Sequence, residues 1–514
     1  MADERPPHDV PAAPDTAPAA PALAPAEAAQ IKQKARLGMI ALGARTVALQ
    51  LIVLIANVWI SRLLDPADFG AYAIAQFAMV MLTFFGDAGL GGALVQQREE
   101  PSRVALSTVF YVQIGMGLAV VAGAFALSPF VHLIWPTLPA GGGWLVRALS
   151  VSFFLTTVRV IPAILMERHL QFTRLATIEV ATTVAFQGSV IFFALHGYRV
   201  WSLVFGSLIQ SAVGVVLALV LRPFVPALAF DRAVLGPMVR FGVPFQLKGM
   251  VNFFNMAVTP VYAGAMLGAD RLGLVNWGQT TAYFPLKLID IVGRVSFPLY
   301  SRLRDDRAEL AALIARNVQV CAMGTLCFVG LVLGIGPELT RVIFGEKWIP
   351  ALPALYVFST AITIGFVSPI IGAAFDALGR PGIFVRLSIG WTTLNWIAVG
   401  ITTPLWPEHF KMVGFVIAYC SHVVLGNAAV IYVLHREMPE ARLWPAVRAS
   451  VVGCLAVAAL GRFALLPLIS GWVTMVAAIV ASVLLFVAIL AVLDRESLRL
   501  RQLLPQVPKE DVAP

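Results

Sequence analysis

Six basic residues lie inside long apolar segments of this chain, where a charge is costly. They are Arg45, Arg159, Lys248, Lys287, Arg294 and Arg462. A charge at the centre of a bilayer costs about 2.5 to 3.5 kcal/mol on insertion scales, so it needs an interior cavity, a partner or an interface. Arg45 and Lys248 have no acid three or four positions away, which favours a cavity. Unpaired cations there suit an anionic ligand, because a pyrophosphate offers several oxygens to charge-assisted hydrogen bonds.

Neutralisation within one helix and snorkelling are the competing interpretations of these cations. Lys287 and Asp290 are three residues apart, and Asp290 and Arg294 are four apart, so these side chains can pair on one helix face. Arg45 and Arg462 have side chains long enough to reach the membrane surface. Whether Arg159 faces the cavity stays open.

Polar residues recur at helical spacing in three predicted helices, and in two of these helices the polar face includes basic residues. On segment 238–266 the face comprises Lys248, Asn252, Asn255, Thr259 and Tyr262; on 273–299 it comprises Gln279, Tyr283, Lys287, Asp290 and Arg294; on 70–96 it comprises Gln76, Thr83 and Asp87. A polar stripe on a membrane helix predicts a water-filled surface. Six charges are expected about 12 to 18 Å deep around one vestibule: Arg45, Arg159, Lys248, Arg294, Asp87 and Asp290.

The composition is that of an integral membrane protein. Hydrophobic residues make up 59% of the 514 residues, charged residues only 13%, and the mean hydropathy is +0.84. Apolar segments of membrane length predict spanning α-helices rather than the alternating strands of a β-barrel. The net charge of +9 comes from scattered loop residues, which argues against nucleic-acid binding. No phosphate-binding loop, zinc motif or nucleophile motif occurs, so we expect no use of energy from bound ATP. We also expect a protein with no enzyme activity, cofactor or metal site.

The order of apolar segments predicts an all-α, multi-pass protein. Residues 1–30 hold 7 Pro and 11 Ala and no apolar core, so we expect a disordered tail rather than a secretory signal. Fourteen spanning helices are predicted near 38–61, 70–96, 106–131, 145–166, 175–196, 200–221, 238–266, 273–299, 311–336, 351–376, 383–404, 411–434, 447–469 and 472–493. With both termini in the cytoplasm, 23 Lys and Arg from Lys32 onward fall on inner segments and 7 on outer loops, as the positive-inside rule requires.

The first part of the chain recurs in the second at an offset of 203 residues. The aligned pairs include Arg45 and Lys248, Leu64 and Leu267, Gly70 and Gly273, Gln76 and Gln279, and Asp87 and Asp290. We therefore expect two pseudo-symmetric six-helix lobes around a central cavity, at 31–232 and 233–436, two appended helices at 437–493, and a tail at 494–514. Such repeats place a substrate site between the lobes and permit alternating access. Coincidence among polar residues is the competing explanation.

Prolines, tryptophans, cysteines and one histidine give further local expectations. The prolines expected to mark helix kinks are Pro162, Pro244, Pro260, Pro285 and Pro369. The tryptophans expected to anchor the outer membrane surface are Trp59, Trp135, Trp144, Trp201, Trp348, Trp406 and Trp472. We expect His422 to be a hydrogen-bonded core residue. Buried apolar positions are expected for Cys321, Cys327, Cys420 and Cys454.

Several short segments taken together resemble one transporter family. They are Arg62–Tyr72 (RLLDPADFGAY), Gly86–Gln96 (GDAGLGGALVQ), Gly197–Leu203 (GYRVWSL), Arg240–Pro244 (RFGVP), Phe344–Trp348 (FGEKW) and Leu378–Pro381 (LGRP). The set is similar to the polysaccharide exporter branch of the multidrug/oligosaccharidyl-lipid/polysaccharide (MOP) superfamily, the bacterial Wzx-type flippases.

The resemblance implies two lobes around a cationic cavity that moves undecaprenyl-pyrophosphate-linked oligosaccharides from the inner to the outer leaflet, for exopolysaccharide, capsule or O-antigen synthesis. Cavity cations hold the pyrophosphate in that family, which points here to Arg45, Lys248, Arg159 and Arg294. The other expected cavity residues, some of them candidates for ion coupling, are Asp87, Asp290, Gln76, Gln279, Lys287, Asn252, Asn255 and Asp376.

The resemblance also implies partners and a location. We expect a monomer in the bacterial cytoplasmic (inner) membrane that acts on a lipid-linked oligosaccharide and works beside a polysaccharide polymerase or export complex. Two functions within the same superfamily stay open: a lipid-II flippase and a multidrug cation antiporter. An antiporter should line its cavity with acids, so the excess of cations argues against it. A glycan polymerase would carry a large outer loop, and the longest outer loops here have about 14 residues.

Overall fold

The computed structural model describes residues 49–86, 94, 100–139, 141–233, 235–236, 250–251 and 253–494. Within these residues every regular element is helical and no strand occurs, so the all-α prediction is confirmed there. Ten helical stretches in the described part are long and apolar enough to cross a membrane, and a shorter apolar helix spans Leu49–Leu63. The described residues from Ile52 to Asp494 belong to one compact unit.

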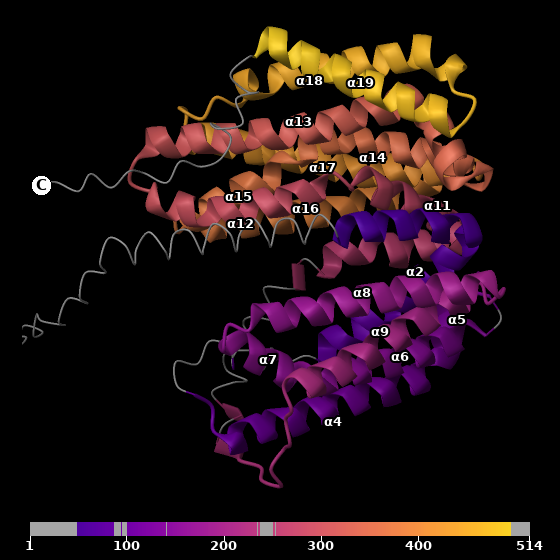
Figure 1. Ribbon diagram of the computed structural model, residues 1–514, viewed down its shortest axis with the longest axis vertical. Coiled ribbons are helices and arrows are strands. Elements are labelled where there is room, and N and C mark those ends of the chain that lie inside the picture. The colour runs from indigo at the N-terminus through magenta and orange to yellow at the C-terminus, as the bar shows by residue number, and fades with distance from the viewer. Residues whose placement is uncertain are drawn as a thin grey trace, which may run out of the picture. The chain divides into compact units, whose positions relative to one another are not determined.

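The helices between residues 52 and 233, which we call the first half, pack mainly against one another. Their bounds are α2 (Pro66–Gly86), α4 (Arg103–Leu127), η1 (Ser128–Phe130), α5 (Val131–Ile134), α6 (Gly142–Val158), α7 (Val160–Arg168), α8 (Phe172–Leu195) and α9 (Val200–Leu221). α8 lies along α9, and α6 lies between α4 and α9 (Figure 1). Ser102 begins α4, because its Oγ accepts the backbone N–H of Ala105 at 3.1 Å.

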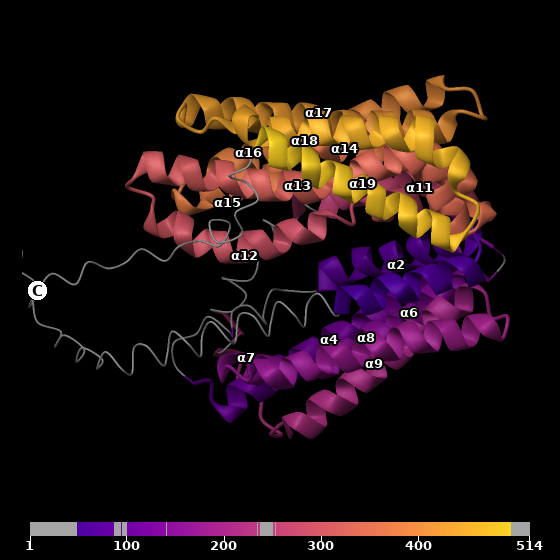
Figure 2. The same cartoon turned by 45° about the horizontal axis from the view of Figure 1, so that its top comes forward.

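The helices between residues 250 and 494, the second half, form the other group. Their bounds are η2 (Val258–Ala263), α11 (Gly264–Ala282), α12 (Leu286–Arg302), α13 (Arg307–Leu339), η3 (Thr340–Phe344), η4 (Glu346–Ala351), α14 (Leu352–Gly365), α15 (Val367–Ala377), α16 (Pro381–Thr402), η5 (Thr403–Leu405), α17 (Lys411–Glu437), α18 (Leu443–Leu460), η6 (Gly461–Leu465), η7 (Leu466–Leu468) and α19 (Trp472–Leu493). α17 packs on α14 and α16, and α18 packs on α13 and α19 (Figures 1 and 2).

Three predicted spans are each broken shortly before a proline. α6 ends and α7 begins at Arg159, three residues before Pro162. α11 ends at Tyr283, two residues before Pro285 and the start of α12. α14 ends and α15 begins at Phe366, three residues before Pro369. Proline lacks the N–H that would bond the carbonyl four residues earlier, and its ring crowds that carbonyl. Pro260 lies in the π-helix η2, and Pro244 lies outside the described residues. The kink prediction is thus confirmed at Pro162, Pro285 and Pro369.

α2 and α11 cross with their backbones in contact. A Cβ atom on Gly70 would lie 1.7 Å from the carbonyl oxygen of Ala269, and one on Gly273 would lie 1.8 Å from that of Pro66. The two contacts are reciprocal, because Pro66 aligns with Ala269 and Gly70 with Gly273 at the offset of 203 residues. Glycine at a membrane helix crossing allows this close approach. We call the end of the unit that carries these four residues the crossing end.

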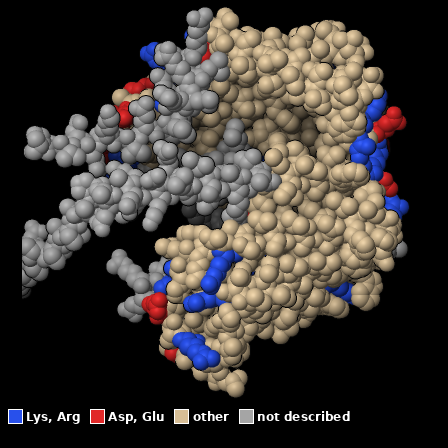
Figure 3. Space-filling view, viewed as in Figure 1, with Lys and Arg blue, Asp and Glu red and all other residues tan. Residues whose placement is uncertain are grey.

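Apolar side chains cover the outside of the helices. On the face drawn in Figure 3, charged side chains gather mostly toward the two ends of the helices, with a broad uncharged surface between them. Exposed apolar residues occur in most of the long helices, for example Ile401 on α16, Leu455 on α18 and Val476 on α19. An apolar belt between charged ends is the surface that a bilayer-spanning protein presents.

A buried polar contact joins α12 and α13. Asn317 of α13 is 9% exposed, and its Nδ2 donates to Ser296 Oγ at 2.9 Å and to Tyr300 Oη at 2.6 Å. Ser296 and Tyr300 are both buried. The amide therefore satisfies two hydroxyl groups in an otherwise apolar layer.

We predict that Asn317→Ala lowers the free energy of unfolding by about 1 to 3 kcal/mol, because two buried hydroxyls lose their donor. Thermal unfolding of the purified protein in detergent measures the change. Ser301→Ala is the matched control, since it removes an exposed hydroxyl from α12. Equal melting temperatures for the two variants would show that the buried contact adds no stability.

Candidate functional site

Half of the predicted cavity residues lack a described side chain. Arg45, Asp87, Lys248 and Asn252 lie outside the described residues. Asp290 and Arg294 belong to α12, but their side chains also lie outside the described part. The paired cations Arg45 and Lys248, and the neutralisation of Asp290 by its neighbours, therefore stay predictions.

Arg159 is half-buried at the break between α6 and α7. A Cβ atom on Gly214 of α9 would lie 2.8 Å from Arg159 Nη1 and 3.5 Å from its Cδ. The same Cβ atom would lie 3.3 Å from Thr182 Cγ2 of α8. The Arg159 side chain thus lies against α9 near α8, among helices of the first half. Contact with a substrate stays a prediction for this residue.

The polar stripe on segment 238–266 packs against protein over its described part. Asn255 donates Nδ2 to Thr392 Oγ1 of α16 at 3.2 Å, and the Tyr262 hydroxyl donates to the carbonyl of Gly400 on the same helix at 3.3 Å. Thr259, between them in the stripe, is buried. The prediction of a water-filled surface is therefore wrong at the buried Thr259, whereas Asn255 and Tyr262 are only partly buried and their place in a cavity stays a prediction.

The repeated glutamines have different surroundings. Gln279 donates Nε2 to the Tyr419 hydroxyl of α17 at 3.2 Å, inside the second half. Gln76 is exposed on α2. Lys287 on α12 and Asp376 on α15 are exposed as well, and a place in the substrate cavity stays a prediction for all three.

His422 and most of the cysteines behave as core residues, as predicted. His422 is buried, its Nδ1 donates to the carbonyl of Tyr419, and its ring meets the Tyr419 ring edge-on at 4.9 Å. Cys321, Cys420 and Cys454 are buried, whereas Cys327 is partly exposed. No group of three His, Cys, Asp or Glu that could hold a metal occurs among the described residues.

Two of the predicted membrane anchors are buried instead. Trp135 is 2% exposed and Trp348 is 0% exposed. Trp135 donates Nε1 to the carbonyl of Pro260 at 2.9 Å, and Trp348 donates Nε1 to the carbonyl of Ser61 at 2.8 Å. The anchor prediction is wrong for both, because their N–H groups find backbone partners inside the protein rather than at the membrane surface. Of the other predicted anchors, Trp59, Trp144 and Trp472 are exposed and Trp201 and Trp406 are partly exposed.

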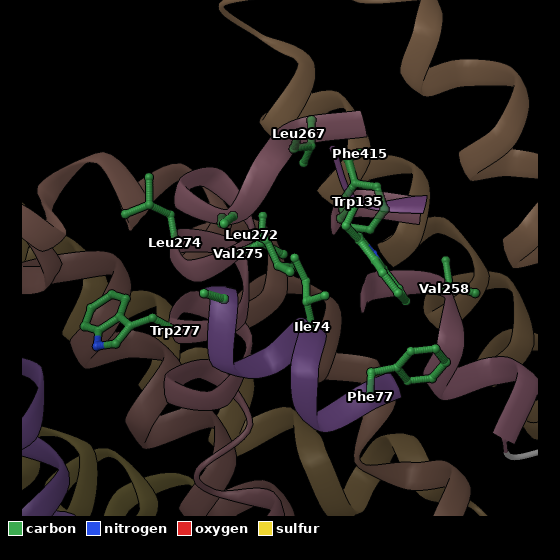
Figure 4. Close-up of a cluster of buried hydrophobic side chains, with 14 of the residues drawn as sticks. Ile74, Phe77, Trp135, Val258, Leu267, Leu272, Leu274, Val275, Trp277 and Phe415 are labelled. Atoms are coloured by element: carbon green, nitrogen blue, oxygen red, sulfur yellow. The ribbon is translucent and has the colours of Figure 1, made fainter. Parts of the chain in front are cut away.

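Both indoles belong to one apolar core at the crossing end, and this core contains residues of both halves. Figure 4 draws residues of this core, among them Trp135 of the first half and Phe415 of the second. Trp348 stacks on Trp277 with 5.0 Å between ring centroids, and it meets the ring of Phe69 edge-on at 5.3 Å. Aromatic packing and backbone contact thus close the same end of the unit.

Charged side chains add contacts at this end. Asp65 pairs with Arg199 at 2.8 Å and with Lys347 at 3.5 Å. Arg62 donates Nε to the carbonyl of Ile343 at 2.7 Å, and Lys347 donates Nζ to the carbonyl of Arg62 at 2.9 Å. Asp65 and Arg199 are largely exposed, so each ion pair adds only about 0 to 1 kcal/mol. Arg62, Arg199 and Lys347 are three of the seven basic residues that we expect on outer loops.

Comparison with known proteins identifies similar sequences. The family model described as "Polysaccharide biosynthesis protein" matches residues 59–353. The lipopolysaccharide biosynthesis protein WzxC of Escherichia coli (strain K12) is 24% identical over 379 residues, which cover 72% of this chain and 76% of that protein. The succinoglycan biosynthesis transport protein ExoT of Rhizobium meliloti (strain 1021) is 24% identical over 313 residues, which cover 60% of this chain and 62% of that protein.

Solved transporter structures share the fold. The lipid II flippase MurJ in an inward closed conformation has a TM-score of 0.68 at 12% identity, covering 90% of this chain and 100% of that chain. An inward-facing multidrug resistance MATE family transporter of the MOP superfamily has a TM-score of 0.56 at 15% identity, covering 76% of this chain and 95% of that chain. At such identities the likeness concerns the fold alone, which is that of a multi-pass transporter.

Proposed function

Because the chain belongs to the polysaccharide biosynthesis protein family, we propose that it moves lipid-linked oligosaccharide units across a bacterial cytoplasmic membrane. The family match carries the proposal, since it covers residues 59–353, more than half of the 514 residues. The transporter fold agrees with it, and so does the name of ExoT, a transport protein, so we infer a transporter rather than an enzyme. The cargo would be an undecaprenyl-pyrophosphate-linked unit of an exopolysaccharide, capsule or O-antigen.

The proposal includes an architecture for alternating access. Fourteen spanning helices would form lobes at 31–232 and 233–436, with helices at 437–493 appended and both termini in the cytoplasm. The reciprocal contacts of Gly70 and Gly273 support the repeat on which these lobes rest, because equivalent residues meet at one crossing. The crossing end would then face outward, and the opposite end would admit substrate from the cytoplasm.

The proposed substrate site is a cationic cavity in the inner half of the membrane. Arg45 and Lys248 would hold the pyrophosphate, because neither has an acid at helical spacing to neutralise it. Arg159 and Arg294 are secondary members of the site. A carboxylate would couple transport to an ion gradient, and its candidates are Asp87, Asp290 and Asp376.

A lipid-II flippase is the second candidate function, favoured by the fold likeness to MurJ with its TM-score of 0.68. A multidrug cation antiporter has weaker support, because the MATE family transporter is the more distant of the two folds and the cavity cations have the wrong sign. The lipid intermediate that accumulates without the protein distinguishes these functions.

Loss of the gene tests the proposal. We expect lipid-linked polysaccharide repeat units to accumulate on the cytoplasmic leaflet while peptidoglycan synthesis continues, because assembly proceeds and only transfer stops. Isolated lipid intermediates and their accessibility to an enzyme added from one side measure this. Accumulation of lipid II would favour the second function, and normal turnover of both intermediates would contradict both.

A further inference from the structure

The two buried indoles connect the halves of the chain in reciprocal directions. Trp135, from the first half, donates to Pro260 of the second at 2.9 Å. Trp348, from the second half, donates to Ser61 of the first at 2.8 Å. Each indole follows or lies in a short helical segment that connects longer helices, α5 for Trp135 and η4 for Trp348.

Each indole lies against the same repeat position of the opposite half, although the two acceptors, Ser61 and Pro260, are not themselves equivalent. Ser61 aligns with Gly264 at the offset of 203 residues. A Cβ atom on Gly264 would lie 2.8 Å from Trp135 Nε1, so Trp135 lies directly against the position equivalent to Ser61. Gly264 thus leaves room for one indole at the point where Ser61 supplies a carbonyl to the other.

We propose that Trp135 and Trp348 form a double latch that holds the crossing end closed, and that both indole hydrogen bonds break when this end opens. The inference rests on the proposed function, because a transporter that works by alternating access must open each end in turn. It adds the residues that hold one end shut.

Burial increases the free energy that is lost when either indole hydrogen bond breaks. Both indoles lie in an apolar core, where an N–H group that loses its partner without reaching water is costly. The bonds therefore break only together with separation of the two halves, when water can replace the carbonyls. Arg62 and Lys347 contribute further bonds between the halves beside Trp348. More hydrogen bonds therefore join the two halves beside Trp348 than the one that Trp135 makes.

Removal of the indole N–H tests the latch. The variants are Trp135→Phe, Trp348→Phe and both together, which keep an aromatic ring. Trp396→Phe is the matched control, since Trp396 donates Nε1 to the carbonyl of Phe254 at 3.0 Å within the second half.

Spin labels across the crossing end give the readout. Both label positions are exposed there: His196 follows α8 in the first half, and Ser470 precedes α19 in the second. Labels at His196→Cys and Ser470→Cys, in full-length protein with its four native cysteines replaced and in lipid nanodiscs, report the separation of the halves by pulsed electron resonance.

We expect each latch variant to raise the ratio of long to short label separations by about threefold to tenfold. The double variant should shift it by about the product of the two effects, and Trp396→Phe should leave it unchanged. An unchanged ratio in the double variant, or an equal shift in the control, would overturn the latch. If Trp135→Phe or Trp348→Phe fails to fold, the ratio measured for the other single variant tests the latch. The readout needs no substrate, so failure of the proposed function leaves it valid.

Discussion

Alanine at Gly70 or at Gly273 should reduce polysaccharide export by at least about tenfold. The added Cβ atom would lie 1.7 or 1.8 Å from a carbonyl oxygen of the opposite helix, whereas a carbon and an oxygen in contact are about 3.3 Å apart or more. α2 and α11 would have to separate by roughly 1.5 Å, and overpacking of this kind costs about 1 to 3 kcal/mol. The crossing end would then close poorly, and alternating access requires that it close.

Two other glycines serve as controls for this prediction. Gly115 of α4 and Gly188 of α8 have nothing within 4 Å of a built Cβ atom. Alanine at either should leave export unchanged and add about 0.5 to 1 kcal/mol of helix stability. Polymer yield from cells, corrected for the amount of folded protein in the membrane, measures the effect. Full export by both Gly70→Ala and Gly273→Ala would show that the crossing tolerates separation.

Replacing Arg45 or Lys248 by alanine should lower export by about tenfold to a hundredfold. A hydrogen bond from a charged donor contributes about 1.5 to 3 kcal/mol, and each variant removes at least one such bond to the proposed pyrophosphate. Arg45→Lys should restore part of the activity, because lysine keeps the charge but lacks the two-pronged geometry of arginine.

Arg304→Ala is the control for the cavity cations, since Arg304 is exposed on a loop and pairs only weakly with the exposed Asp305. It should export normally. Polymer yield at equal membrane levels again gives the measurement. If Arg45→Ala and Lys248→Ala both export like Arg304→Ala, the paired-cation site is wrong.

Helices and breaks could be predicted from sequence because they depend on local chemistry. Long apolar runs predict helices in a bilayer, where every backbone group must find a partner within its own segment. Pro162, Pro285 and Pro369 each follow a break because of their missing N–H, a property that needs no tertiary information. The offset of 203 residues likewise makes Gly70 and Gly273 equivalent, and these two glycines meet at the helix crossing.

Contacts between distant segments could not be predicted in this way. A tryptophan near the end of a span is usually a membrane anchor, and nothing local to Trp135 or Trp348 distinguishes them from the exposed Trp144. Their burial depends on carbonyls 125 and 287 residues away along the chain. Likewise, the polar spacing of Asn255 and Tyr262 does not indicate that each hydrogen-bonds to α16, 137 and 138 residues away along the chain.

Reconstituted transport with a reversible bridge across the crossing end tests the central claim most directly. Asp65 and Lys347 pair at 3.5 Å from opposite halves, so Asp65→Cys and Lys347→Cys can be joined by a short disulfide-forming linker. In liposomes with an undecaprenyl-pyrophosphate-linked oligosaccharide, we predict movement between leaflets by the unbridged protein, arrest on bridging and recovery on reduction. Single-cysteine proteins treated alike should not be arrested. Absence of movement by the folded, unbridged protein would contradict the proposed function, and undiminished movement by the bridged protein would contradict opening at this end.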